Sequence, residues 1–162
     1  VVSMKLRQTI GGPSGVAVIE ERHFMYYGPD YALDAAAPPL PGSWDAERTI
    51  APDPVTMFRF SAIRFNSHRI HYDRDYTVKK EGHPGLIVQG TLINHLLLEM
   101  AREMLPDTPV TRFDFRIHKP IYDTGPFTLR GAPRPGGESA VLCALDADGK
   151  LSMTADALYA EG

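Results

Sequence analysis

The hydrophobic pattern of this chain changes its period at Pro106, and this change restricts the possible folds more than any other feature. Between residues 90 and 105, apolar residues recur four apart in two adjacent rows, which is the spacing of one broad helical face. The rows are Leu92, Leu96, Met100 and Met104, and Ile93, Leu97, Ala101 and Leu105. Such a wide stripe is typical of core packing rather than of a ligand-binding face, and it predicts a helix that is covered by a sheet and ends at Pro106.

Beyond Pro106 the apolar residues alternate with polar ones, which is the period of a strand. Phe113, Phe115 and Ile117 form one such run, and Phe127 and Leu129 begin another. Residues 141–145 and 151–159 flank the sequence D-A-D-G-K, in which Asp-Gly predicts a tight hairpin. A long helix followed by antiparallel strands predicts an α+β fold in which a curved antiparallel sheet wraps the helix.

The N-terminal third has a different pattern. Residues 5–9 and 16–26 alternate on either side of G-G-P-S-G and predict two strands. We expect residues 31–53, which include a Pro/Ala-rich run, to form an exposed linker. Residues 54–64 predict a short helix, and residues 66–75 predict a loop because they are too polar for a core strand. The expected organisation is a single domain over residues 1–162, with leading strands in 1–30, the linker in 31–53 and the core in 54–162.

Composition narrows the class of protein. The 162 residues are 43% hydrophobic and 23% charged, which is the mix of one ordinary soluble domain. A net charge of −3 gives no reason to expect a nucleic-acid partner. The single cysteine, Cys143, excludes an internal disulfide, lies in an apolar run as a small core residue, and fits a reducing compartment such as the cytoplasm. Polar residues interrupt the most apolar stretch, residues 91–105, and we expect neither a membrane span nor a signal peptide.

Residues 61–73, S-A-I-R-F-N-S-H-R-I-H-Y-D, gather the polar groups that could do chemistry. Asn66, His68 and His71 lie within six positions of one another. An imidazole titrates near neutral pH and can both accept and donate a proton there. A single histidine is more often structural than catalytic, but the cluster makes His71 the leading candidate. The chain shows no phosphate-binding glycine loop and no cysteine pair for zinc, so we expect no metal and no cofactor.

This segment resembles the motif G-D-x-N-P-L-H of the MaoC-like hot-dog enoyl-CoA hydratases. Asn66 stands at the motif's aspartate, His68 at its asparagine and His71 at its histidine. The longer stretch F-R-F-S-A-I-R-F-N-S-H-R-I-H-Y-D-R-D-Y is similar to one branch, which contains fungal mitochondrial 3-hydroxyacyl-thioester dehydratases and bacterial mesaconyl-C4-CoA or itaconyl-CoA hydratases. The resemblance extends from about Leu6 and implies the hot-dog fold. Many members of the branch carry an additional N-terminal hot-dog half, which this chain lacks or has lost.

The resemblance implies an acyl-CoA hydratase or dehydratase, with coenzyme A as part of the substrate. His71 would move the proton and Asn66 would hold the water without ionising, with His68 or a carboxylate as a possible helper. The segment E-G-H-P-G-L-I-V-Q-G is similar to the family's P-I-x-H-G passage, which implies that the Gly90 N–H binds the thioester oxygen. Arg69 and Tyr72 flank His71 and are candidates for contact with a substrate carboxylate. The basic residues that could meet the CoA phosphates are Arg69, Lys79, Lys80, Arg112, Arg116 and Lys119.

Two other functions remain open. A hot-dog thioesterase would need a carboxylate to activate water, and the motif offers Asn66 instead. A non-catalytic subunit that binds acyl groups would have no need to retain Asn66 and His71. A single sheet over one helix leaves an uncovered edge, so we expect a homodimer with Gly90 and His71 near the interface.

Overall fold

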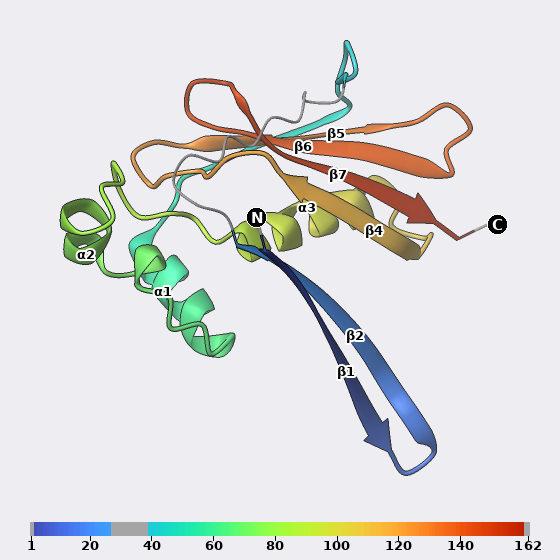
Figure 1. Ribbon diagram of the computed structural model, residues 1–162. Helices are drawn as coiled ribbons and strands as arrows, with labels where there is room; N and C mark the ends of the chain where they lie inside the picture. Colours follow the sequence, from blue (N-terminus) through green and yellow to red (C-terminus); the bar gives the residue numbers. More distant parts are fainter. Residues whose placement is uncertain (1, 27–38, 161–162) are drawn as a thin grey trace. The chain divides into compact units, whose positions relative to one another are not determined.

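The computed structural model describes residues 2–26 and 39–160 (Figure 1). The chain forms two compact units, residues 1–35 and 36–162, rather than the single domain that the sequence predicted. The first eight residues of the predicted linker, 31–38, lie outside the described residues.

The first unit is a two-stranded antiparallel ribbon. Strand β1, Val2–Gly12, pairs with β2, Gly15–Tyr26, so that Val2 lies opposite Tyr26. The turn between them uses Gly15 at a φ of +113°, a conformation that side chains disfavour. Every residue of β1 is exposed within this unit. The two leading strands predicted from alternation are thus confirmed.

The second unit contains a five-stranded antiparallel sheet in the order β3-β5-β6-β7-β4. Its strands are β3 Ala46–Ile50, β4 Val110–Ile117, β5 Phe127–Pro133, β6 Ser139–Leu145 and β7 Leu151–Tyr159. Strands β6 and β7 meet in the predicted hairpin, where Gly149 has a φ of +75°. The strands predicted after Pro106 are confirmed.

Strand β3 corrects the predicted linker, because it lies inside residues 31–53 and forms one edge of this sheet. Ala46, Arg48 and Ile50 are half-buried and alternate with exposed Glu47 and Thr49. The strand pairs with β5 from Ala46 opposite Gly131 to Ile50 opposite Phe127. Five residues with two charges give too weak an alternation to be recognised beside a Pro/Ala-rich run, and the pairing with β5 decides the conformation.

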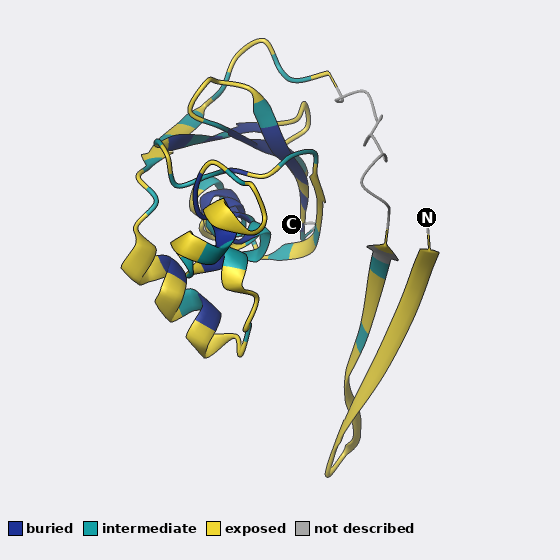
Figure 2. Ribbon diagram, turned by 60° about the vertical axis from the view of Figure 1, so that its left-hand side comes forward, coloured by how far each residue is buried: buried dark blue, intermediate teal, exposed yellow. Residues whose placement is uncertain are grey.

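Helix α3, Gly90–Met104, lies across one face of the sheet (Figures 1 and 2). Its buried residues are Ile93, Leu97, Met100 and Ala101, and they pack with the inward side chains of β5, β6 and β7. Both predicted apolar rows belong to this core. Cys143 is buried in β6, where burial raises the pKa of its thiol to about 11, as expected for an inert core residue. The predicted α+β architecture is confirmed.

Three short helical segments connect β3 to α3. Helix α1, Pro54–Ile63, confirms its prediction and begins with Asp53, whose carboxylate accepts from the N–H groups of Val55 and Thr56. The predicted loop over residues 66–75 is wrong in part, since it contains the 3-10 turn η1, Arg69–His71, and the start of α2, Arg74–Lys79. Asp73 explains the second helix, because its side chain caps the N–H of Tyr76 at 3.0 Å. Among the described residues, no helix has the length and apolar character that crossing a membrane requires.

Candidate active site

His71 lies at the end of a turn that begins where α1 stops. The N–H of Phe65 donates to Ala62 O at 3.1 Å, and the N–H of Asn66 donates to Ser61 O at 2.8 Å. These two bonds form a Schellman motif, which reverses the chain after a helix. The Asn66 carboxamide oxygen then accepts the N–H of His68 at 3.1 Å and starts a second turn. The chain therefore returns past α1 and places His71 in η1, the only buried residue between 65 and 73.

The imidazole of His71 is held in one tautomer. Its Nδ1 lies 2.7 Å from the backbone oxygen of Ile87. A carbonyl can only accept, so Nδ1 carries the hydrogen and Nε2 is left as a basic nitrogen. Burial is the main cause that lowers the pKa of His71; the bond to Ile87 partly opposes it, and His68 lowers the pKa slightly more. The ring is therefore neutral at pH 7 and able to accept a proton.

His68 and Asn66 lie beside this ring, as the sequence predicted. The rings of His68 and His71 meet edge to face, with centroids 5.7 Å apart. His68 is exposed and Asn66 is half-buried. Because the Asn66 oxygen is occupied by a backbone donor, its Nδ2 is the free end of the carboxamide, and no other group in the described chain takes it up. Asn66 can thus offer hydrogens to a water or a substrate oxygen.

Gly90 is the first residue of α3, and its N–H lacks the carbonyl partner that residues deeper in the helix have. Such an N–H favours developing negative charge. A Cβ at Gly90 would lie 2.6 Å from Ile117 Cδ1, so a larger residue would displace that side chain of β4. The bond from His71 to Ile87 ties the histidine to the segment that enters α3 three residues later.

Gln89 was predicted only as a replacement for the family's histidine, and the structure gives it a contact of its own. Its side chain is buried, and Nε2 donates to Met57 O at 2.7 Å and to Ser61 Oγ at 2.8 Å. Because Met57 O can only accept, the amide orientation is fixed. Gln89 therefore links the start of α3 to α1, the helix that leads into the His71 turn. No pattern in the sequence indicates this cross-connection, which joins residues 28 and 32 positions apart.

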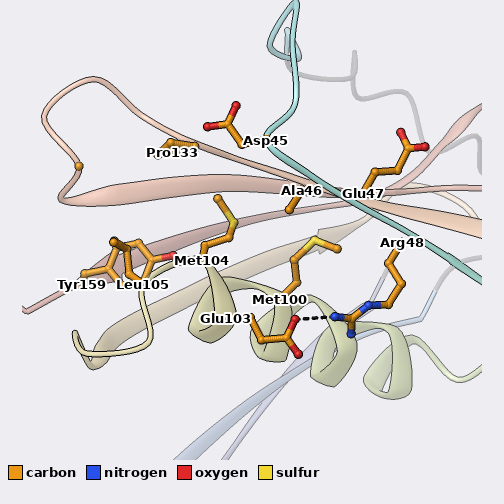
Figure 3. A pocket seen from close by; sticks show the side chains of 11 residues that line it. Asp45, Ala46, Glu47, Arg48, Met100, Glu103, Met104, Leu105, Pro133 and Tyr159 are labelled. Atoms are coloured by element: carbon orange, nitrogen blue, oxygen red, sulfur yellow. Dashed lines mark hydrogen bonds and ion pairs between the residues drawn. The ribbon is translucent and has the colours of Figure 1, made fainter.

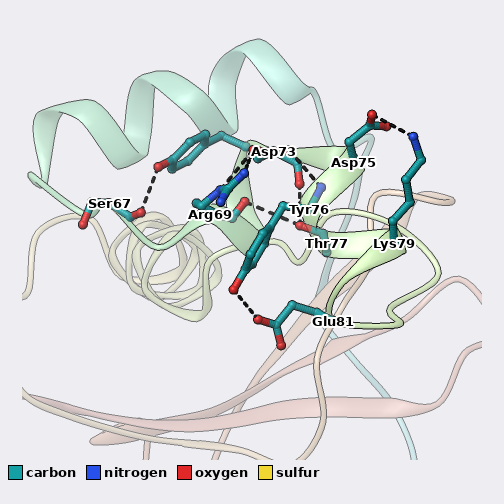
Figure 4. Close-up of polar contacts among 9 residues, drawn as sticks. Ser67, Arg69, Asp73, Asp75, Tyr76, Thr77, Lys79 and Glu81 are labelled. Carbon is teal, nitrogen blue, oxygen red and sulfur yellow. Dashed lines mark hydrogen bonds and ion pairs between the residues drawn. The ribbon is translucent and has the colours of Figure 1, made fainter.

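Arg69 and Tyr72, the two candidates for substrate contact, are both bound to their own chain (Figure 4). The Arg69 guanidinium donates to Asp73 at 2.7 Å and stacks 4.1 Å from the centre of the Tyr76 ring. The Tyr72 hydroxyl donates to Ser67 O at 2.8 Å. These contacts give both residues a part in holding the turn, and their role toward a substrate stays a prediction.

Most of the basic residues named for the CoA phosphates also have acidic neighbours. Lys79 pairs with Asp75 at 2.8 Å, Arg112 pairs with Asp114 at 2.5 Å, and Lys119 pairs with Asp146. All three belong to different surfaces of the unit, so the sequence list does not define a single phosphate site. The described residues hold no group of three or more side chains suited to a metal ion.

A separate hollow of about 530 Å³ lies beside the C-terminal half of α3 (Figure 3). Met100, Met104 and Tyr159 contribute apolar surface to it, and the ion pair from Arg48 to Glu103, at 2.5 Å, joins β3 to α3 at its side. None of the predicted site residues lines this hollow. Its walls offer no neutral base, so the chemistry belongs to the other end of α3.

The family model of hydroxyacyl-thioester dehydratase type 2 matches residues 1–123. The chain belongs to this family. The mesaconyl-C(4)-CoA hydratase of Chloroflexus aurantiacus is 42% identical over 142 residues, which make up 86% of this chain and 50% of that protein. The mitochondrial hydroxyacyl-thioester dehydratase type 2 of Schizosaccharomyces pombe is 35% identical over 80 residues, 48% of this chain and 27% of that protein. This chain thus matches half or less of the length of these two relatives.

Solved structures share the fold at low sequence identity. The MaoC-like dehydratase of Phytophthora capsici superposes with a TM-score of 0.73 over 99% of this chain and 59% of its own, at 13% identity. The (R)-hydratase of A. caviae gives a TM-score of 0.62 over 72% of this chain and 93% of its own, at 18% identity. The hot-dog fold that the motif implied is confirmed.

Proposed function

We propose that this chain hydrates the double bond of an α,β-unsaturated acyl-CoA and catalyses the reverse dehydration. The observation that carries the proposal is the bond from His71 Nδ1 to Ile87 O, which leaves a neutral, buried Nε2 beside Asn66. The likeness to a mesaconyl-C(4)-CoA hydratase supports a CoA thioester as substrate and makes a branched, carboxylated acyl group one to test.

The reaction needs a base, an acid and a site for enolate charge. His71 Nε2 takes a proton from water, and the water oxygen forms a bond to the β-carbon. The thioester oxygen gains negative charge, which the N–H of Gly90 at the start of α3 stabilises. The proton on His71 then passes to the α-carbon, so that one water has been added and the enzyme is restored.

Asn66 acts in this scheme by position. Its Nδ2 can donate to the oxygen of the attacking water, while its own oxygen is held by the N–H of His68. A carboxamide does not ionise, so one histidine both removes and delivers the proton. His68 is the neighbouring group that can exchange a proton with solvent, because it is exposed and lies against the His71 ring.

The geometry gives less support to a thioesterase. The nearest carboxylate in the turn, Asp73, caps α2 through Tyr76 N–H and accepts from Arg69. These bonds lower the pKa of Asp73, the Tyr76 N–H first and the Arg69 side chain next, and they occupy both of its oxygens. Asp73 is thus a poor base for attack on a thioester carbonyl. A non-catalytic subunit would leave the fixed tautomer of His71 without a use.

One assay separates the three functions. Crotonyl-CoA and mesaconyl-CoA are incubated with the protein, and the products are resolved by chromatography. A hydroxyacyl-CoA supports the hydratase, and free CoA with the released acid supports a thioesterase. If neither product forms and neither thioester is consumed, the proposal is refuted for these substrates.

We also propose a homodimer that forms along β4. This strand is an edge of the sheet, and Phe115 and Ile117 on it remain 45% and 47% exposed. Ile117 also contacts the space around Gly90, so a partner on this edge would lie beside the proposed oxyanion site. Several structural relatives are complexes, such as ChsH1-ChsH2 of Mycobacterium tuberculosis. Light scattering that finds an active monomer near 17.9 kDa would overturn this assembly. The buried, unoxidised Cys143 fits a cytoplasmic location.

A further inference from the structure

Phe65 has a backbone conformation that a phenylalanine rarely adopts. It is the only residue other than glycine with a positive φ in the described chain, at 52°. It occupies the position after the end of α1 where Schellman motifs favour glycine. The left-handed conformation is unfavourable for a side chain of this size. The Phe65 ring is also 96% exposed, so packing within this unit does not compensate for the strain.

The ring belongs to a shallow aromatic hollow of about 380 Å³. Phe58 and Ala62 of α1, Phe65 and Tyr72 contribute its apolar walls, and Asn66 lies at its margin. Phe58 and Tyr72 meet edge to face with centroids 6.3 Å apart, and the bond from Tyr72 to Ser67 O holds that ring in place. The hollow is therefore a pre-organised aromatic surface next to the proposed catalytic turn.

The chain around this hollow is basic, although the protein as a whole is acidic. From residue 54 to residue 72 there is no Asp or Glu, whereas Arg59, Arg64 and Arg69 all fall in this span. Arg59 and Arg64 are exposed on the same helix as Phe58. An aromatic surface flanked by free guanidinium groups suits a planar base that carries phosphates.

We propose that this hollow binds the adenine nucleotide end of the acyl carrier, with the base stacked on Phe65 and the phosphates near Arg59 and Arg64. This inference rests on the proposed function, and it assigns the substrate to coenzyme A thioesters rather than to thioesters of a carrier protein, which has no adenine. The flexible pantetheine arm allows one molecule to reach both the hollow and His71. The strained conformation of Phe65 then serves to present its ring to the nucleotide.

The experiment compares two substrates that share the acyl group. The kcat/KM for crotonyl-CoA is divided by that for the crotonyl thioester of N-acetylcysteamine, which lacks the nucleotide. In Phe65→Gly we expect this ratio to fall on the order of 5- to 100-fold, because base–aromatic stacking is lost. The Tm of this variant should be maintained or raised, since glycine relieves the strain and removes an exposed ring. Phe65→Asn, which tolerates the same backbone conformation, should show the same fall.

Ile63→Ala is the matched control, since Ile63 is 74% exposed near the end of the same helix but does not line the hollow. Its ratio should equal that of the wild type. The inference is overturned if the Phe65 variants keep the wild-type ratio, or if the wild type itself does not distinguish the two substrates. A change of mass in Phe65→Gly, measured by light scattering, would assign the surface to a second copy of the chain instead.

Failure of the proposed function has a different result. If the wild type hydrates neither thioester, titration with adenosine 3′,5′-bisphosphate tests the hollow on its own. Binding to the wild type that weakens in Phe65→Gly and persists in Ile63→Ala supports the nucleotide site without the hydratase. No binding to the wild type overturns the site.

Discussion

The His71 turn, residues 65–73, and the β6–β7 hairpin are stabilised in opposite ways. In β6, every residue from Ala140 to Leu145 is buried. In the turn, His71 is the only buried residue, and Phe65 is almost fully exposed. Apolar burial and a continuous ladder of backbone bonds stabilise the hairpin, whereas short-range polar contacts hold the turn.

This difference separates stability from chemistry in one small unit. Removing an apolar group from the hairpin takes away dispersion contacts and buried area, which the whole fold shares. Removing a polar group from the turn changes where one side chain points and leaves the sheet untouched. Substitutions in the two regions should therefore affect different measurements, and each of the following predictions tests that separation.

The largest effect should come from His71→Ala. Without Nε2 no group in the turn with a fixed position can take the proton from water, and we expect kcat/KM to fall on the order of 10²- to 10⁴-fold. His95→Ala is the control, because His95 is exposed on α3 and its ring bonds to Thr91 O of its own helix. Kinetics with crotonyl-CoA measure both variants, and circular dichroism checks their folding. A folded His71→Ala protein with full activity would remove the histidine from the mechanism.

The opposite outcome is expected for Leu142→Ala in β6. This side chain is fully buried in the core, and truncation to alanine should lower the free energy of unfolding by about 2–5 kcal/mol. Urea unfolding measures the loss, with the exposed Val78→Ala as control. Activity per folded molecule should stay close to that of the wild type. A specific loss of kcat in the folded fraction would show that the sheet contributes to the chemistry directly.

An intermediate effect is expected at Asn66. Asn66→Ala removes both the donor to water and the acceptor of the His68 N–H, so we expect a loss on the order of 10²-fold in kcat/KM. Asn66→Asp keeps the acceptor and loses the donor, and it should retain measurable activity with a changed pH profile. Ser67→Ala is the control, because Ser67 holds Tyr72 through its backbone oxygen. Equal rates in Asn66→Ala and the wild type would contradict the water-holding role.

The sequence predicted the hairpin better than the turn, for a physical reason. Alternation in residues 141–145 and 151–159 is a local pattern, and the structure places both strands as expected. The turn depends on contacts that no local pattern encodes, such as the cap of α2 by Asp73 and the bond from His71 to Ile87 across 16 residues. The family motif indicated His71 and Asn66, but it could not indicate which nitrogen of His71 is free.

The same limit explains β3 and Gln89. Strand β3 becomes a strand because β5 lies beside it, and Gln89 acquires its role because α1 supplies Met57 O and Ser61 Oγ. Both are decided by pairing between distant segments, which overrides a weak local preference. Polar residues that join segments, rather than apolar ones that fill the core, were the ones missed.

The smallest effect concerns pH, and it applies to both measurements at once. Burial lowers the pKa of His71, so kcat/KM should rise with pH to a plateau, with a midpoint below the ordinary histidine value of about 6.5. For stability, the unfolded chain binds the His71 proton more readily than the folded chain does. The free energy of unfolding should therefore be unaffected by His71 above about pH 6.5 and should fall as the pH drops through the lowered pKa.

Burial also lowers the pKa of His118, so part of the acid-induced loss of stability belongs to that residue. Urea unfolding between about pH 5 and 7.5, repeated in His71→Gln and in His118→Gln, assigns each share. His118→Gln should leave the kinetic midpoint in place, because His118 bonds to Thr154 at the sheet rather than to the turn. A wild-type midpoint at or above the ordinary histidine value would mean that the base is not the buried ring held by Ile87.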